Sequence, residues 1–183
     1  MLITELWFAH SMNNKWSKQM FRTILTLGAI GLATTGAWAT EIGGSVSSKC
    51  SVFTANAGVY GNPTADELST KSADGGIDAK VRYDVTLANK YTAKISWPTS
   101  FTSSPTLTDS VNWDGETKYS AGTVTAMSGY EAAKTEYNEH TEFALSQAGT
   151  TWFTIESEAK YGSNKAFPGG EYKAMVTAIC VAN

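Results

Sequence analysis

Between residues 40 and 183 the chain has one histidine, His140, in the stretch NEHTEF. Glu139 and Glu142 could orient its imidazole, as a third group does in a catalytic triad. Catalysis by a nucleophile and a base usually needs a histidine near a serine or cysteine, but this range has no nucleophile elbow, no HExxH motif and no second histidine. We interpret His140 as a partly exposed residue at the start of a strand, and we predict that the protein is not an enzyme.

Two acidic stretches offer oxygen ligands for calcium. SADGGIDAK contributes Asp74 and Asp78, and NWDGE contributes Asn112, Asp114 and Glu116. Neither stretch matches a complete EF-hand loop, and two cysteines with one histidine cannot form a closed zinc site. We predict no metal and no cofactor. Because carboxylates are numerous, a pair of acids suited to glycoside hydrolysis stays open, with a secreted hydrolase as the third candidate function.

Aromatic residues could form a platform on which a sugar stacks. Aromatic rings on strands are more often packed in the core, although a ring near a turn can face a ligand. The candidate ligand-facing aromatics are Trp113 and Tyr119, from a set that also includes Trp97, Trp152, Tyr60, Tyr130, Tyr137 and Tyr161. A secreted carbohydrate-binding or ligand-binding module is therefore the alternative function.

The first 39 residues have the pattern of a secretory signal peptide. Three basic residues precede an apolar run over residues 24–33, and Ala37-Trp38-Ala39 follows as a small-x-small cleavage site. The run is too short for a membrane span, which needs about 20 residues. We predict a signal peptide over residues 1–39, with residues 1–11 as an overrun of the start site, and one domain over residues 40–183.

The predicted mature chain carries 11 Lys and Arg against 16 Asp and Glu, a net charge of about −5. An acidic chain without a basic cluster argues against nucleic acid and anionic membranes as partners. Cys50 and Cys180 both lie in this part. Because secreted chains meet an oxidising compartment, we predict a disulfide between them.

Apolar residues recur mostly at every second position, which is typical of strands. Strands are predicted over residues 44–53, 80–87, 90–97, 123–127, 141–146, 151–157 and 172–181. Ala88-Asn89 and Asp114-Gly115 are predicted as two-residue hairpin turns. Ser128 with Glu131 predicts a short helix, and Thr64 with Glu67 a turn or two of helix.

This set of elements predicts an all-β fold: an immunoglobulin-like antiparallel β-sandwich of about seven or eight strands with one or two short helices. First and last strands commonly meet in such folds. The predicted bridge would therefore staple the two ends of the domain and, on the chain-entropy model, stabilise it by about 5 kcal/mol.

Three stretches, GSVSSKCSV, YTAKISWP and GGEYKAMVTA, resemble bacterial fimbrial subunits and related pilin-like secreted proteins. The resemblance implies an immunoglobulin-like sandwich with an early strand that carries a cysteine and a closing strand with a G-x-Y motif. Many such pilins pair the first cysteine with one in the second strand, whereas the only partner for Cys50 here is Cys180.

The resemblance and the lack of a catalytic constellation favour a secreted structural or adhesive surface subunit, fimbria-like, in the periplasm and then at the cell surface or outside the cell. It would act by strand addition, in which an extended segment pairs with an open sheet edge of a neighbour. Ile42 and Val46 are the candidate donor-strand contacts. The expected partners are further copies of the chain or other surface subunits, and carbohydrate in the alternative function.

Overall fold

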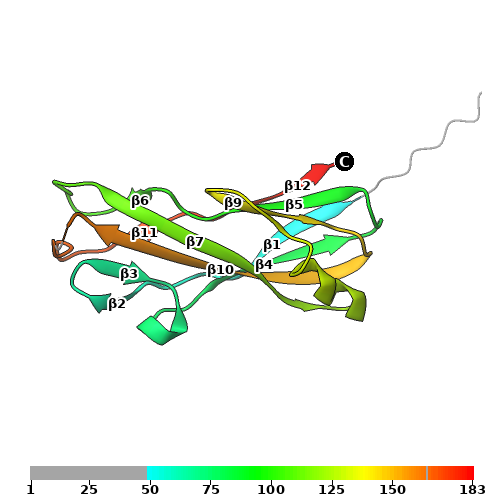
Figure 1. Ribbon diagram of the computed structural model, residues 1–183, viewed down its shortest axis with the longest axis horizontal. Helices are drawn as coiled ribbons and strands as arrows, with labels where there is room; N and C mark the ends of the chain where they lie inside the picture. The colour runs from blue at the N-terminus through cyan, green and yellow to red at the C-terminus, as the bar shows by residue number, and fades with distance from the viewer. Residues whose placement is uncertain (1–48, 164) are drawn as a thin grey trace, which may run out of the picture. The chain divides into compact units, whose positions relative to one another are not determined.

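The computed structural model describes residues 49–163 and 165–183 (Figure 1). The predicted signal peptide, its cleavage site and the candidate donor residues Ile42 and Val46 lie outside the described residues. The described chain is mostly antiparallel sheet, so the all-β prediction is confirmed.

A six-stranded antiparallel sheet is built around one long central strand, β10. One edge of β10 pairs with β4 and β3, its other edge pairs with β7, and β1 and β2 extend the sheet beyond β4 and β3. The strands are β1 (Cys50–Asn56), β2 (Gly61–Thr64), β3 (Glu67–Ser69), β4 (Ala79–Val85), β7 (Val111–Gly122) and β10 (Gly149–Tyr161).

A four-stranded antiparallel sheet has the order β12-β5-β9-β8. Its strands are β5 (Tyr91–Ser96), β8 (Thr135–Glu136), β9 (His140–Ala144) and β12 (Thr177–Ala182). A two-stranded sheet pairs β6 (Phe101–Ser103) with β11 (Lys173–Ala174), and the 3₁₀ helices are η1 (Ser72–Asp74) and η2 (Thr125–Tyr130). Among the described residues, no helix has the length and apolar character needed to cross a membrane.

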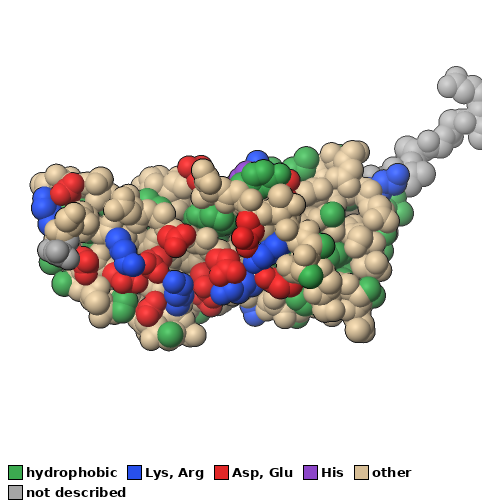
Figure 2. Space-filling view, viewed as in Figure 1, with side chains coloured by type: hydrophobic (Ala, Val, Ile, Leu, Met, Phe, Trp, Pro, Cys, Tyr) green, Lys and Arg blue, Asp and Glu red, His purple; other side chains and the backbone are tan. Residues whose placement is uncertain are grey.

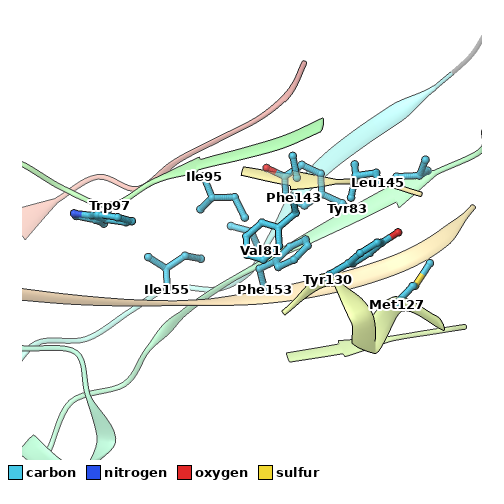
Figure 3. Packing of buried hydrophobic residues seen from close by; sticks show 12 residues of the cluster. Val81, Tyr83, Ile95, Trp97, Met127, Tyr130, Phe143, Leu145, Phe153 and Ile155 are labelled. Atoms are coloured by element: carbon cyan, nitrogen blue, oxygen red, sulfur yellow. The ribbon is translucent and has the colours of Figure 1, made fainter. Parts of the chain in front are cut away.

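The hydrophobic core receives side chains from both larger sheets (Figure 3). Burial alternates along β10, where Phe153 and Ile155 are fully buried, because successive side chains of a strand point to opposite faces. Tyr83 of β4 packs edge-to-face on Phe153, with ring centroids 5.6 Å apart. Burying one such side chain stabilises the fold by about 1.5–3 kcal/mol, so this core holds the two sheets together.

The hairpin predicted at Ala88-Asn89 is wrong, because β4 and β5 belong to different sheets. The chain crosses from one sheet to the other here, and the N–H of Asn89 donates to the carbonyl of Leu145 at 2.9 Å. Asn89 does adopt a positive φ of 60°, so the local turn signal was correct. A local signal could not reveal that β5 pairs with β9 and β12 rather than with β4.

The turn predicted at Asp114-Gly115 is also wrong, since both residues lie inside β7, opposite Glu158 and Ser157 of β10. Gly115 does not have a positive φ. A Cβ atom there would lie 2.4 Å from Cγ of Trp97. The glycine therefore allows the close approach of an indole ring rather than a turn.

Two helix predictions also need correction. Ser128 lies inside η2 and donates to the carbonyl of Thr125 at 2.9 Å, so it does not cap a helix, and η2 replaces the strand predicted over residues 123–127. Thr64 and Glu67 pair across the β2–β3 hairpin rather than starting a helix. The strand predicted over residues 172–181 is interrupted, because β11 and β12 pair with different strands.

Candidate functional site

The edge strands β1 and β12 meet at one side of the domain, which we call the open seam (Figure 1). Each is the last strand of its sheet on that side. A disulfide joins Cys50 of β1 to Cys180 of β12, with their Cα atoms 6.1 Å apart. The predicted bridge is confirmed, and it links the edges of two different sheets.

Backbone groups along the open seam can be assigned from the hydrogen bonds at its ends. The N–H of Thr86 donates to the carbonyl of Lys49 at 3.1 Å, and the N–H of Asn183 donates to the carbonyl of Lys90 at 3.0 Å. Along an antiparallel ladder, hydrogen-bonded pairs alternate with pairs that form no hydrogen bond. Every second residue of β1 and of β12 therefore bonds to the neighbouring strand of its own sheet, and the residues between them point their N–H and C=O groups outward. The residues that direct their N–H and C=O groups away from their own sheet include Cys50, Val52, Ala178 and Cys180.

The inward-facing apolar side chains of the seam are only partly covered. Val52, Val176 and Ala178 pack against the core but stay half-buried. On the adjacent inner strands, Tyr83 and Ile95 are fully buried. The apolar side chains in the middle of the core are therefore shielded from solvent, whereas those at the seam remain partly exposed.

Tyr83 fixes the distance between the sheets beside the seam. Its hydroxyl, from β4, donates to the carbonyl of Ile179 on β12 at 3.2 Å and lies 3.4 Å from that of Lys94 on β5. Burial raises the pKa of the Tyr83 phenol, against the opposing effect of the Ile179 hydrogen bond. The phenol therefore remains a neutral hydrogen-bond donor. It links β12 to β4 but does not cover the half-buried side chains at the seam.

His140 lies at the start of β9, as predicted, in contacts that hold the β8–β9 hairpin. Its ring stacks on Tyr137 with centroids 4.4 Å apart, and Nε2 lies 3.4 Å from Oε1 of Glu142. Its carbonyl accepts the N–H of Tyr137 at 2.9 Å. These contacts fix the position of the imidazole in the hairpin.

The acids considered as calcium ligands have separate local partners. Asp74 accepts from the hydroxyl of Ser69 at 2.6 Å, and Asp78 accepts from that of Thr70 at 3.4 Å. Within residues 49–163 and 165–183, no three histidine, cysteine, aspartate or glutamate side chains are arranged to hold a metal ion.

The two candidate ligand-facing aromatics both lie half-buried on the inner side of β7. Trp113 packs against Phe101 with ring centroids 4.6 Å apart, and Tyr119 packs against Tyr130 at 6.2 Å. Tyr137, by contrast, is 48% exposed. The inner positions of Trp113 and Tyr119 favour packing over ligand contact.

Sequence reasoning missed a polar hollow beside β7, lined in part by Asp114, Glu116, Glu156 and Glu158. The alternate spacing of each acidic pair was visible in the sequence. The pairing of β7 with β10, which places the four acids together, was not.

Comparisons of the chain with protein-family models, curated proteins and solved structures gave no match.

Proposed function

We propose that the chain is a secreted structural or adhesive surface subunit, fimbria-like, that assembles by strand addition and performs no catalysis. The observation that carries the proposal is the open seam, where two unpaired strand edges lie side by side above half-buried apolar residues. Exposed edges of this kind are templates for pairing with another chain. On this proposal the two larger sheets form an immunoglobulin-like sandwich that lacks cover at one side.

The bridge limits where an added strand can enter. Neighbouring strands lie about 4.8 Å apart, so a strand placed between β1 and β12 needs about 9.6 Å between them. The Cα atoms of Cys50 and Cys180 are only 6.1 Å apart. The added strand must therefore pair away from the bridge, beside Val52 and Ala178, where the apolar edge is incomplete.

The segment TEIGGSVSSK, which directly precedes β1, supplies the matching donor. Ile42 and Val46 fall on the same alternate positions, so an extended segment presents both on one face. We propose that this segment of one copy fills the open seam of the next copy. Gly43 and Gly44 leave it little preference for pairing within its own chain.

The test compares two double variants of residues 40–183 with the bridge intact. Ile42→Asp with Val46→Asp places two charges on the proposed inserted face, and Ser45→Asp with Ser47→Asp places the same charges on the opposite face. Because each buried aliphatic side chain contributes about 1.5–3 kcal/mol, the first pair should weaken assembly by a factor of about 100 or more, and the second pair should weaken it far less.

Sedimentation velocity and electron microscopy of protein secreted from its native host measure the assembly. Deleting residues 40–46 should leave a folded monomer that no longer joins wild-type oligomers. If the two double variants weakened assembly equally, the segment could not insert with the face that carries Ile42 and Val46. A wild-type chain that stays monomeric at high concentration, even with co-expressed neighbouring subunits, would overturn the proposal.

A further inference from the structure

A hollow of about 380 Å³ lies where β7 of the six-stranded sheet approaches β8 and β9 of the four-stranded sheet. Thr141 of β9, three residues of β10 and Trp97, which directly follows β5, also line it. Pockets of about 300–1,000 Å³ accommodate small molecules. Figure 2 shows that acidic side chains gather in the middle of this face, with lysines between them.

The walls of the hollow carry an excess of negative charge. Among the described residues that line it, one lysine, Lys71, stands against five carboxylates: Asp114, Glu116, Glu136, Glu156 and Glu158. Glu116 lies directly opposite Glu156, and Asp114 lies directly opposite Glu158, in the β7–β10 ladder. Like charges at such positions destabilise a sheet, and departures from a local rule of this kind concentrate at functional sites.

Lysines compensate part of this charge from the margin of the hollow. Lys118 lies 3.0 Å from Glu116 and 2.8 Å from Glu156. Lys134 lies 2.8 Å from Glu136; burial lowers its pKa, but the surrounding carboxylates outweigh that effect and hold the pKa above its usual value. These pairs fix the orientation of the carboxylates.

Asp114 is left without a cationic partner in the described part of the chain. Its Oδ1 accepts the N–H of Gly115 at 2.8 Å, and the side chain is otherwise exposed. It is therefore the carboxylate of the hollow most accessible to a positively charged ligand.

Two further side chains point to a ligand rather than to a purely structural cluster. Thr141 is 1% exposed and contributes to the wall, yet its hydroxyl oxygen is buried and has no hydrogen-bond partner among the described residues. Tyr137 presents a half-exposed ring at the rim, held by stacking on His140. A buried hydroxyl without a hydrogen-bond partner is unfavourable. A ligand N–H group that reached the oxygen of Thr141 from the hollow would supply the missing hydrogen bond.

We infer that this hollow binds an organic cation that carries primary ammonium or guanidinium groups. Carboxylates form strong charge-assisted hydrogen bonds with such groups, and an aromatic ring attracts them through its face. Both a free polyamine and a lysine or arginine side chain of another protein have this chemistry. The inference concerns the side of the domain formed by β7 and β8, so it does not depend on strand addition at the open seam.

Isothermal titration calorimetry of the oxidised chain, residues 40–183, tests the inference with three probes. Spermidine represents a free polyamine, the capped dipeptide Ac-Lys-Lys-NH₂ represents a protein side chain, and glucose represents a neutral sugar. Quenching of tryptophan fluorescence that disappears in Trp97→Phe would place the bound probe in the hollow, because the indole of Trp97 lines it.

Asp114→Asn should weaken binding of the cationic probe about tenfold, since a charge-assisted hydrogen bond is lost. Tyr137→Leu should weaken it several-fold. The matched control is Glu171→Gln, which removes an exposed carboxylate outside the hollow and should leave the affinity unchanged. Binding should also weaken between 50 and 500 mM salt, because exposed charges are screened.

Spermidine binding alone would identify a free polyamine as the ligand, and equal or tighter binding of the dipeptide would identify a protein side chain. Either result supports the inference if Asp114→Asn lowers the affinity and Glu171→Gln does not. Binding of glucose in preference to both cations would overturn it, as would the absence of binding by either cation at millimolar concentration.

Discussion

Gly115→Ala should destabilise the domain because Trp97 occupies the space that a side chain would need. The new Cβ atom would lie 2.4 Å from Cγ and 2.6 Å from Cδ1 of Trp97, whereas ordinary contacts begin at 3.4 Å. The two groups must therefore separate by about 1 Å. The indole is only 8% exposed, so it cannot swing into solvent without disturbing the core.

Overpacking of this size costs about 1–3 kcal/mol. The loss of unfolded-state freedom on replacing glycine by alanine acts in the opposite direction by about 0.4–1 kcal/mol. We expect a net decrease of about 1–2 kcal/mol in the free energy of unfolding. Urea denaturation followed by circular dichroism would measure it.

Gly129→Ala is the matched control, because a Cβ atom at Gly129 would meet nothing within 4 Å. It should change the free energy of unfolding by less than about 0.5 kcal/mol. In a Trp97→Leu background, Gly115→Ala should lose most of its effect, since contacting residues are energetically coupled. If Gly115→Ala and Gly129→Ala cost the same, or if the Gly115→Ala effect persists without the indole, steric exclusion by Trp97 is not the reason for the glycine.

The remaining predictions concern the bridge and one acidic side chain. Replacing Cys50 and Cys180 together by serine should lower the free energy of unfolding by about 5 kcal/mol on the chain-entropy model for a separation of 130 residues; a loss below 1 kcal/mol in urea denaturation would contradict that model here. Hydrogen bonds from Lys160 and Lys71 hold the pKa of Glu158 below its ordinary value of 4.5, so this carboxylate stabilises the fold above pH 4.5 and loses that effect as the pH falls through its depressed pKa. Glu158→Gln should therefore destabilise the protein at pH 7 and much less at pH 2, and an equal effect at both pH values in urea denaturation would contradict the assignment.

Period-two patterns predicted the inner strands β4, β5, β9 and β10 because the cause of such a pattern is local. Tyr83 and Val85 in β4, and Phe153 and Ile155 in β10, alternate with more exposed residues as a strand covered on one face requires. The cysteine pair was predictable for a different reason, since two cysteines allow only one intramolecular bridge.

Strand partners could not be predicted, because they depend on contacts between distant residues. Asn89 has the positive φ of a turn residue, but only tertiary packing decides that β4 and β5 enter different sheets. Gly115 follows an aspartate as a turn glycine does, yet its neighbour in space is Trp97. The hollow escaped prediction for the same reason, because the register of β7 on β10 is what sets Glu116 against Glu156.

The bridge between the edges of the two sheets also determines how the domain would carry a mechanical load. A pull applied to the backbone just before Cys50 and just after Cys180 passes through two sulfur atoms, so it reaches none of the ladders in between. The domain cannot lengthen under such a load while the bridge is intact. After reduction, the 130-residue separation could extend by roughly 400 Å, at about 3.3–3.6 Å per residue less the folded span. The redox state of this one disulfide would thus decide whether a row of such domains keeps its length under load or lengthens as each domain unfolds.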